Sequence, residues 1–241
     1  MWWFAAAHAN LLDLYRRMRS HSVADQPAPM RLLDAGCGTG GLLAKLALAF
    51  PTHTVIGLDA DVFAAQRARR KSGRPICVGS VNALPFADGA FAAIFSADVL
   101  CHRAVDERTA LGQFRRCLSE RGLLLLNLPA YQWLLSRHDA AVYNARRYSR
   151  SVLRALLQAA DFRDLDVNYW NSVLFPVMVL TRKFLPATHG RVSDVGFPPP
   201  SIDAIGRIAT GFETRLLQHA IHLPFGGSLI VAAIKEGGPD V

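Results

Sequence analysis

The stretch LLDAGCGTGG, residues 32–41, places one aspartate and four glycines directly after an apolar run. Buried strands of a parallel sheet are apolar, and such sheets bind ligands at the carboxyl ends of their strands. Glycines let the backbone approach a ligand without an intervening Cβ atom. The stretch therefore predicts a ligand-binding turn between the first strand and the first helix of an α/β fold.

Strands and helices are expected to alternate on both sides of this turn, which favours a parallel sheet covered on both faces. Helices are also expected at residues 1–19, 149–160, 172–185 and 201–219. The helix that follows the second strand should begin at the cap Asp61 and end before Gly73, and the next should run to Gly122. The expected strands are 30–36, 54–60, 75–79, 91–97, 123–129, 162–170 and 226–235.

The whole chain is expected to form one domain in four parts. These are an N-terminal helix and linker (1–29), a cofactor-binding core (30–129), an acceptor-side loop and helical insert (130–225) and a last strand (226–236). The N-terminal helix should bury an apolar stripe made of Phe4, Ala7, Leu11, Leu14 and Met18.

Composition restricts the function classes. Of the 241 residues, 51% are hydrophobic and 19% charged, which is typical of a globular protein. The net charge of +8 comes from scattered basic groups without an aromatic–basic reader motif, so no nucleic-acid partner is predicted. Four cysteines without CxxC spacing argue against a metal site. No apolar run approaches the roughly 20 residues of a membrane span, so we expect a cytoplasmic protein with at most a peripheral membrane contact.

The glycine turn is compatible with two cofactor classes. Gly36, Gly38 and Gly41 satisfy G-x-G-x-x-G, the dinucleotide pattern, but a lone match of this kind is weak. Asp34 would repel a pyrophosphate and suits a cationic ligand group. Asp59, at the end of the second strand, suits a ribose diol in either case.

With ALPFADGAF at 83–91, the motifs over residues 31–129 resemble the class I S-adenosylmethionine-dependent methyltransferases. The resemblance implies a Rossmann-like fold with a seven-stranded sheet of order 3-2-1-4-5-7-6, its last strand antiparallel, and helices on both faces. It further implies an N-terminal helical lid and a helical insert before the last strand. The implied cofactor is S-adenosyl-L-methionine, and the product S-adenosyl-L-homocysteine.

The resemblance also implies a cofactor site. Asp34 and the backbone of Gly36 would take the methionine amino group, and Asp59 would accept both ribose hydroxyls. Ser80 stands where the family commonly has an acid for the adenine amino group, so either Ser80 or Asn82 is expected there. The full expected set, with Cys37 as a small filler and Gly38 and Gly40 allowing close approach, is Asp34, Gly36, Cys37, Gly38, Gly40, Asp59, Ala60, Ser80, Val81, Asn82, Leu84 and Ser96. Ala60 and Leu84 would contact the adenine.

The acceptor should approach from the ends of the fourth and fifth strands, so residues 96–102 and 127–149 supply the catalytic candidates. His138 is expected to be a general base, an acceptor-binding group or a loop anchor. Tyr131 is expected to be a wall of the site, and His102 an acceptor-side or a structural histidine. Arg146 and Arg147 would bind an acidic acceptor, face solvent or pair with Asp139. The chain further resembles a bacterial methyltransferase-domain subgroup through WWF at 2–4, PAY at 129–131, HD at 138–139, RRY at 146–148 and YWNSVLFP at 169–176.

Some alternatives stay open. Trp2 and Trp3 would either close the cofactor cleft or simply pack. Residues 172–185 would pack on the sheet edge, form a homodimer contact, line an apolar acceptor channel or dock on a membrane surface. The predicted function is methyl transfer from S-adenosylmethionine to oxygen or carbon of a small or lipid-like acceptor. The alternatives are an inactive cofactor-binding partner protein and an NAD(P)-dependent oxidoreductase.

Overall fold

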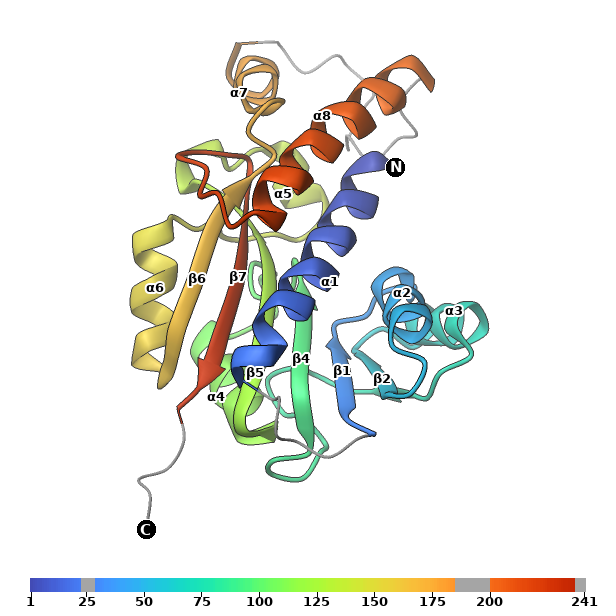
Figure 1. The fold of residues 1–241 in the computed structure, drawn as a ribbon. Coiled ribbons are helices and arrows are strands. Elements are labelled where there is room, and N and C mark those ends of the chain that lie inside the picture. Colours follow the sequence, from blue (N-terminus) through green and yellow to red (C-terminus); the bar gives the residue numbers. More distant parts are fainter. Residues whose placement is uncertain (23–28, 185–199, 237–241) are drawn as a thin grey trace.

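A computed structural model describes residues 1–22, 29–184 and 200–236. Its centre is a seven-stranded sheet of order β3-β2-β1-β4-β5-β7-β6 (Figure 1). Only β7 is antiparallel, to both β5 and β6. The predicted sheet order is therefore confirmed. The strands are β1 (Arg31–Ala35), β2 (Thr54–Asp59), β3 (Ile76–Val78), β4 (Phe91–Ala97), β5 (Leu118–Pro129), β6 (Phe162–Trp170) and β7 (Ser228–Lys235).

Helices α3 and α6 begin at the caps that the sequence predicts. Asp61 caps α3 by accepting from the backbone N–H groups of Phe63 and Ala64, and Gly73 ends it in the left-handed conformation. Ser149 caps α6 in the same way. The described helices are α1 (Trp2–Ser22), α2 (Gly41–Ala49), α3 (Val62–Ser72), α4 (Glu107–Cys117), α5 (Arg137–Ala141), α6 (Arg150–Ala159), α7 (Phe175–Phe184) and α8 (Pro200–Gln218), with a 3₁₀ turn at Gln132–Leu134.

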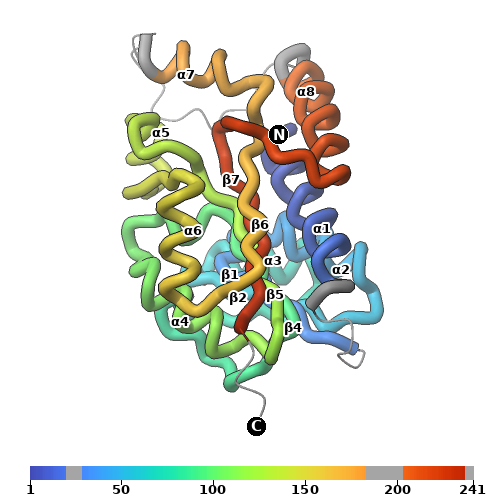
Figure 2. The backbone as a smooth tube through the Cα atoms, turned by 60° about the vertical axis from the view of Figure 1, so that its left-hand side comes forward, coloured from blue at the N-terminus to red at the C-terminus, as the bar shows by residue number. Residues whose placement is uncertain are grey.

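The two faces of the sheet bury separate cores. Leu33 of β1 packs in a cluster with residues of α4 and α6. Its neighbour Leu32 points to the other face and packs with residues of α1 and α2. Figure 2 shows α4 and α6 on one side of the sheet and α1, α2 and α8 on the other. Burial on both faces explains why the strands are apolar at consecutive positions.

Several local predictions were wrong. Helix α4 ends at Cys117 rather than Gly122, because Leu118 is already extended and pairs with Phe91 of β4. Phe4 is 46% exposed and lies outside the packed stripe of α1. The segment after β5, expected to be a loop, contains the 3₁₀ turn and α5. The linker at 24–29 and the proline-rich turn at 197–201 fall largely outside the described residues.

Helix α1 is a structural layer of the fold more than a lid, because Ala7, Leu11, Leu14 and Tyr15 are buried against the sheet. Its N-terminal end, with α5 and α7, lies at the end of the sheet towards which β1 and β4 point (Figure 1). Within the described ranges no helix is both long and apolar enough to span a membrane.

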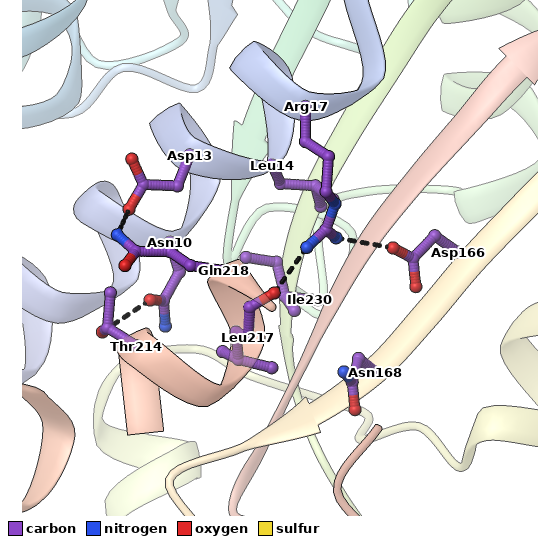
Figure 3. A pocket seen from close by; sticks show the side chains of 10 residues that line it. All are labelled: Asn10, Asp13, Leu14, Arg17, Asp166, Asn168, Thr214, Leu217, Gln218 and Ile230. Atoms are coloured by element: carbon purple, nitrogen blue, oxygen red, sulfur yellow. Dashed lines mark hydrogen bonds and ion pairs between the residues drawn. The ribbon is translucent and has the colours of Figure 1, made fainter. Parts of the chain in front are cut away.

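A polar cavity of about 20 Å³ lies between α1, α8 and the strands β6 and β7 (Figure 3). Arg17 of α1 donates to the Leu217 carbonyl and pairs with Asp166 of β6 at 2.7 Å. A cavity of this size holds about one water molecule. It therefore belongs to the helix–sheet packing and is too small for a nucleoside.

Candidate active site

The glycine turn is fastened to the end of β2 by backbone hydrogen bonds. The N–H groups of Gly36 and Cys37 donate to the Leu58 carbonyl at 2.7 and 2.9 Å. The N–H of Gly38 donates to Oδ2 of Asp59 at 2.7 Å. Because β1 and β2 are neighbouring parallel strands, the carboxylates of Asp34 and Asp59 both lie at the carboxyl ends of these strands.

Glycine is required at two positions of the turn for different reasons. Gly36 has φ +79°, and a Cβ there would lie 2.3 Å from Cγ2 of Val99, just after β4. Gly40 also has φ +79°, and its Cβ would lie 2.8 Å from the backbone of Ala68 in α3. The close approach expected at Gly40 is therefore to α3, whereas Gly38 faces open space with no atom within 4 Å.

Asp34 is a buried carboxylate with an unpaired oxygen. It is 1% exposed, and its Oδ2 has no hydrogen-bond partner among the described residues. Burial raises the pKa of Asp34 to about 7; the Leu43 backbone hydrogen bond opposes this shift and the charge of Asp59 adds to it. A buried acceptor left in this way is costly unless a donor reaches it. The site thus fits a ligand that brings a cationic donor, such as an ammonium group.

Asp59 has oxygens that are already oriented. Oδ2 accepts from Gly38 and Oδ1 from the N–H of Asp61 at 2.9 Å. Each carboxylate oxygen can accept a further hydrogen bond, so a diol remains within its capacity. Between the two acids lies Cys37, whose pKa is raised to about 12 by burial and by Asp34 and Asp59. The thiol stays protonated, as expected of a small filler.

The residues expected around adenine divide into exposed and buried ones. Ala60 and Ser80 are exposed, and Ser80 Oγ accepts from the N–H of Asn82 at 3.1 Å. The Asn82 amide donates to the Ala104 carbonyl and accepts from the N–H of Asp106, so it holds the start of α4. Asn82 is therefore held in place by the protein, whereas among the described residues the exposed Ser80 hydroxyl makes only this local hydrogen bond.

The other members of the expected cofactor set are buried. Val81 and Leu84 are each 5% exposed and belong to the core. Ser96 of β4 is 1% exposed, and its hydroxyl donates to the Ala35 carbonyl at 3.0 Å. These three side chains offer little accessible surface to a ligand and instead support the residues above them.

The acceptor-side candidates differ in chemistry. Tyr131 stacks on Tyr169 with ring centroids 5.2 Å apart, and burial together with Tyr169 raises its pKa to about 12. His102 accepts from the N–H of Ala104 through Nδ1 at 3.2 Å, so the neutral ring carries its hydrogen on Nε2 and acts as a donor. Burial, Arg103 and Arg146 lower the pKa of His102, against the nearby Asp59. His138 is partly buried on α5.

The basic pair after α5 is engaged within the protein. Arg147 binds Oδ1 of Asp139 through Nε at 2.9 Å and Nη2 at 2.7 Å, and both side chains are almost fully buried. Burial opposes ionisation of Asp139, but Arg147 and its other donors hold the pKa of that carboxyl below its usual value. Of the alternatives for Arg147, pairing with Asp139 is the one the structure shows.

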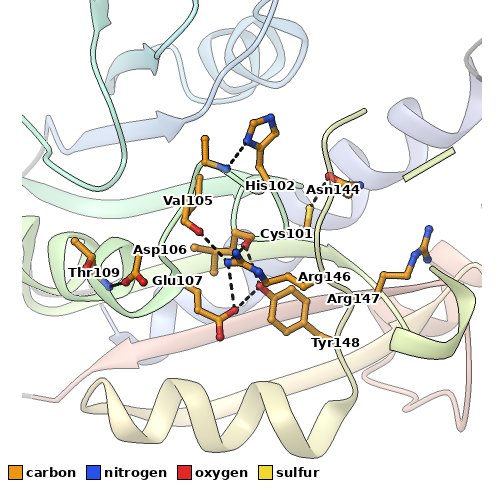
Figure 4. Close-up of polar contacts among 12 residues, drawn as sticks. Cys101, His102, Val105, Asp106, Glu107, Thr109, Asn144, Arg146, Arg147 and Tyr148 are labelled. Carbon is orange, nitrogen blue, oxygen red and sulfur yellow. Dashed lines mark hydrogen bonds and ion pairs between the residues drawn. The ribbon is translucent and has the colours of Figure 1, made fainter. Parts of the chain in front are cut away.

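Arg146 belongs to a second network, which joins residues 144–148 to residues 100–107 (Figure 4). Its guanidinium donates to the carbonyls of Leu100 and Val105 and lies 3.6 Å from Glu107. Tyr148 donates to the Leu100 carbonyl at 2.9 Å and lies 2.8 Å from Oε2 of Glu107. These contacts hold residues 144–148 against residues 100–107.

The tryptophans at the start of α1 pack against other elements. The Trp2 ring fills the space beside Gly206 of α8, where a Cβ would lie 2.5 Å from it. Trp3 stacks on the buried Trp170 of β6, with ring centroids 5.8 Å apart. Of the two alternatives, simple packing describes their contacts.

Sequence reasoning missed Asp98, the residue after β4. It has φ +57°, which is uncommon for a residue with a side chain, and its N–H donates to the Asn127 carbonyl at 2.8 Å. Burial raises the pKa of Asp98 to about 7, against the hydrogen bond from Asn127 and the charge of Arg147. The sequence did contain a signal for this residue. Asp98 is an acid directly after an apolar strand, and it lies within residues 96–102, which were expected to face the acceptor.

Comparisons with known proteins agree with this site. A family model described as a methyltransferase domain matches residues 33–126. The chain is 28% identical over 180 residues to malonyl-[acyl-carrier protein] O-methyltransferase of Geobacter sulfurreducens, a match covering 68% of this chain and 66% of that protein. It is 32% identical over 128 residues to 24-methylenesterol C-methyltransferase 2 of Oryza sativa, covering 49% and 34%. The chain thus spans less than two thirds of the length of these relatives.

The fold has solved counterparts as well. Phosphoethanolamine N-methyltransferase 2 of Haemonchus contortus, in complex with S-adenosyl-L-methionine, aligns with a TM-score of 0.59 at 18% identity, covering 94% of this chain and 52% of that one. The sheet order, the glycine turn between two acidic strand ends and the sequence matches all agree. Residues 33–126 match the methyltransferase-domain family, and the fold is that of the class I S-adenosylmethionine-dependent methyltransferases.

Proposed function

We propose that this chain binds S-adenosylmethionine and transfers its methyl group to oxygen or carbon of a small or lipid-like acceptor. The observation that carries the proposal is the unpaired, buried Oδ2 of Asp34 beside Asp59 at the glycine turn. Oδ2 would accept from the methionine ammonium group, and Asp59 from the two ribose hydroxyls. Ala60 and Ser80 would border the adenine.

When bound, S-adenosylmethionine supplies a methyl group on a positively charged sulfur, from which an acceptor displaces it in line. The protein has to hold the acceptor in that line and exclude water. Tyr131, just past the end of β5, would form the wall that does so. His138 on α5 and His102 after β4 would border the acceptor.

An apolar acceptor is supported by the surroundings of Tyr131. Its ring contacts those of Trp133 and Phe175, with centroids 5.7 and 5.4 Å apart, and Phe225 continues the cluster beside Phe175. Trp133 is 49% and Phe225 44% exposed. Exposed aromatic surface of this kind suits a hydrocarbon chain or ring. One relative is named for a sterol, which is an apolar ring system.

The alternatives have less support. A dinucleotide would place a pyrophosphate near the buried acid Asp34, where the two negative charges repel each other. An inactive binding module predicts cofactor affinity too weak to detect at tens of micromolar. The same titration separates both from the proposed function.

The test is calorimetric titration with S-adenosylmethionine, S-adenosylhomocysteine and NAD⁺. We expect the first two to bind and NAD⁺ not to bind. Asp59→Ala should weaken binding by at least about 100-fold, because two charge-assisted hydrogen bonds are lost. Asp61→Ala is the matched control, since Asp61 caps α3 without a place in the proposed site. Binding of NAD⁺ alone, or of none of the three, would refute the proposal.

A further inference from the structure

The residue that the expected site leaves unexplained is Asp98. It directly follows β4, and the next residue, Val99, packs over Gly36 of the cofactor turn. Among the described residues, the carboxylate has one side-chain hydrogen-bond donor, the Asn127 amide, at 3.2 and 3.3 Å from its two oxygens. Asp98 thus stands between the expected cofactor site and the ends of β4 and β5, where the acceptor is expected.

A network of hydrogen bonds holds Asp98 in its position. Trp170 of β6 donates from Nε1 to Oδ1 of Asn127 at 2.8 Å, in the interior of the sheet. This bond fixes the orientation of the amide, so its Nδ2 has to face Asp98. The left-handed backbone at Asp98 is held by its bond to the Asn127 carbonyl. A strained backbone kept by a buried side-chain network is a frequent feature of functional sites.

Tyr131, His102 and the two arginines of the acceptor side are poorly suited to accept a proton. Tyr131 has a raised pKa and stays a neutral phenol. The Nδ1 atom of His102 already accepts a hydrogen bond. Arg146 and Arg147 are bound to carbonyls and carboxylates of the protein. A carboxylate acceptor would therefore meet the charge of Asp98 without the help of these two arginines.

We infer that Asp98 is the general base of this site, and that the acceptor is a hydroxyl group rather than a carboxylate. The inference rests on the proposed methyltransferase function and narrows its acceptor class. Asp98 takes the hydroxyl proton while an oxygen lone pair forms the new C–O bond to the methyl carbon. The electron pair of the broken C–S bond stays on sulfur, which becomes uncharged. A base whose pKa lies close to neutral pH suits this role.

The type of atom that receives the methyl group can be determined without knowing the identity of the acceptor. The protein is incubated with a bacterial metabolite extract and S-adenosylmethionine labelled in its methyl group, and the labelled products are isolated. A methyl ester releases labelled methanol in mild base. A methyl ether withstands base and releases labelled methyl iodide in hydriodic acid, under conditions that leave N–CH₃ bonds intact. A methyl group on carbon withstands both treatments.

We expect a base-stable label that hydriodic acid releases. Asp98→Asn keeps the shape of the side chain and should slow labelling by about 100- to 10,000-fold, the usual contribution of a general base. Its calorimetric affinity for S-adenosylmethionine should stay within about twofold of the original. Asp161→Asn is the matched control, because Asp161 also has a positive φ. Asp161 precedes β6, at the end of the sheet opposite to Asp98, and its side chain is 60% exposed. This variant should label at the original rate.

Three kinds of result would overturn the inference. One is a label released as methanol, which means a carboxylate acceptor, or a label that withstands both treatments, which means a carbon or nitrogen acceptor. Another is an Asp98→Asn variant that labels as fast as the original protein, or a loss of rate that follows His138→Ala instead. The third is no labelled product at all from a protein that binds S-adenosylmethionine, which would refute the proposed transfer itself and this inference with it.

Discussion

Asp34 makes a testable link between stability and function. Its pKa is about 7 in the folded protein and 3.8 as an isolated side chain. Between these two values the folded state holds a proton that the unfolded state has released. Asp34 therefore destabilises the folded state increasingly as the pH rises from about 4 to about 7. The difference between the two pKa values corresponds to a cost of about 4 kcal/mol at pH 8.

The substitution Asp34→Asn removes this charge. The free energy of unfolding of the variant should therefore rise relative to that of the original protein as the pH increases. We expect this difference to grow by about 3 kcal/mol between pH 5 and pH 8. An amide NH₂ without an acceptor costs about 1–3 kcal/mol, but at every pH alike. Asp98 titrates over a similar range in both proteins, so its contribution cancels.

Urea unfolding at pH 5 and pH 8 measures the difference. S-Adenosylmethionine at 100 times its Kd should add about 2.7 kcal/mol to the original protein and nothing to Asp34→Asn, which lacks the carboxylate for the ammonium group. A difference that changes by less than about 1 kcal/mol with pH would refute the argument about burial. Equal stabilisation of both proteins by the cofactor would refute the role of Asp34 in binding.

Two further substitutions test the scaffold by urea unfolding. Gly40→Ala should lower the free energy of unfolding by about 3 kcal/mol, because it combines a left-handed residue with a 2.8 Å contact to α3. Gly38→Ala should lower the free energy of unfolding by only about 1 kcal/mol, because no atom lies within 4 Å of the added Cβ. Equal losses in the two alanine variants would contradict this account. Asp139→Ala should cost about 3–5 kcal/mol, because it leaves Arg147 charged and buried without its partner. A cost below 1 kcal/mol would show that the pair is not structural.

Local errors in the sequence prediction have a common cause. Helix α4 was expected to continue to Gly122, since residues 118–121 do not break a helical pattern. The pairing of Leu118 with Phe91 of β4 overrides that local preference. Phe4 was placed in the buried stripe because it has the right spacing, but the structure leaves it 46% exposed. In both cases a distant element decides what the local pattern leaves open.

Sequence patterns alone predict the order of strands and helices along the chain, the glycine turn and the two acidic strand ends of the expected cofactor site. These depend on periodicity, caps and turn residues, which act over a few neighbouring positions. Only the tertiary structure joined Asp98 to Asn127, 29 residues away, and Asn127 to Trp170, 43 residues away. Side-chain hydrogen bonds of this kind depend on which strands become neighbours and in what register, which no short stretch of the chain encodes.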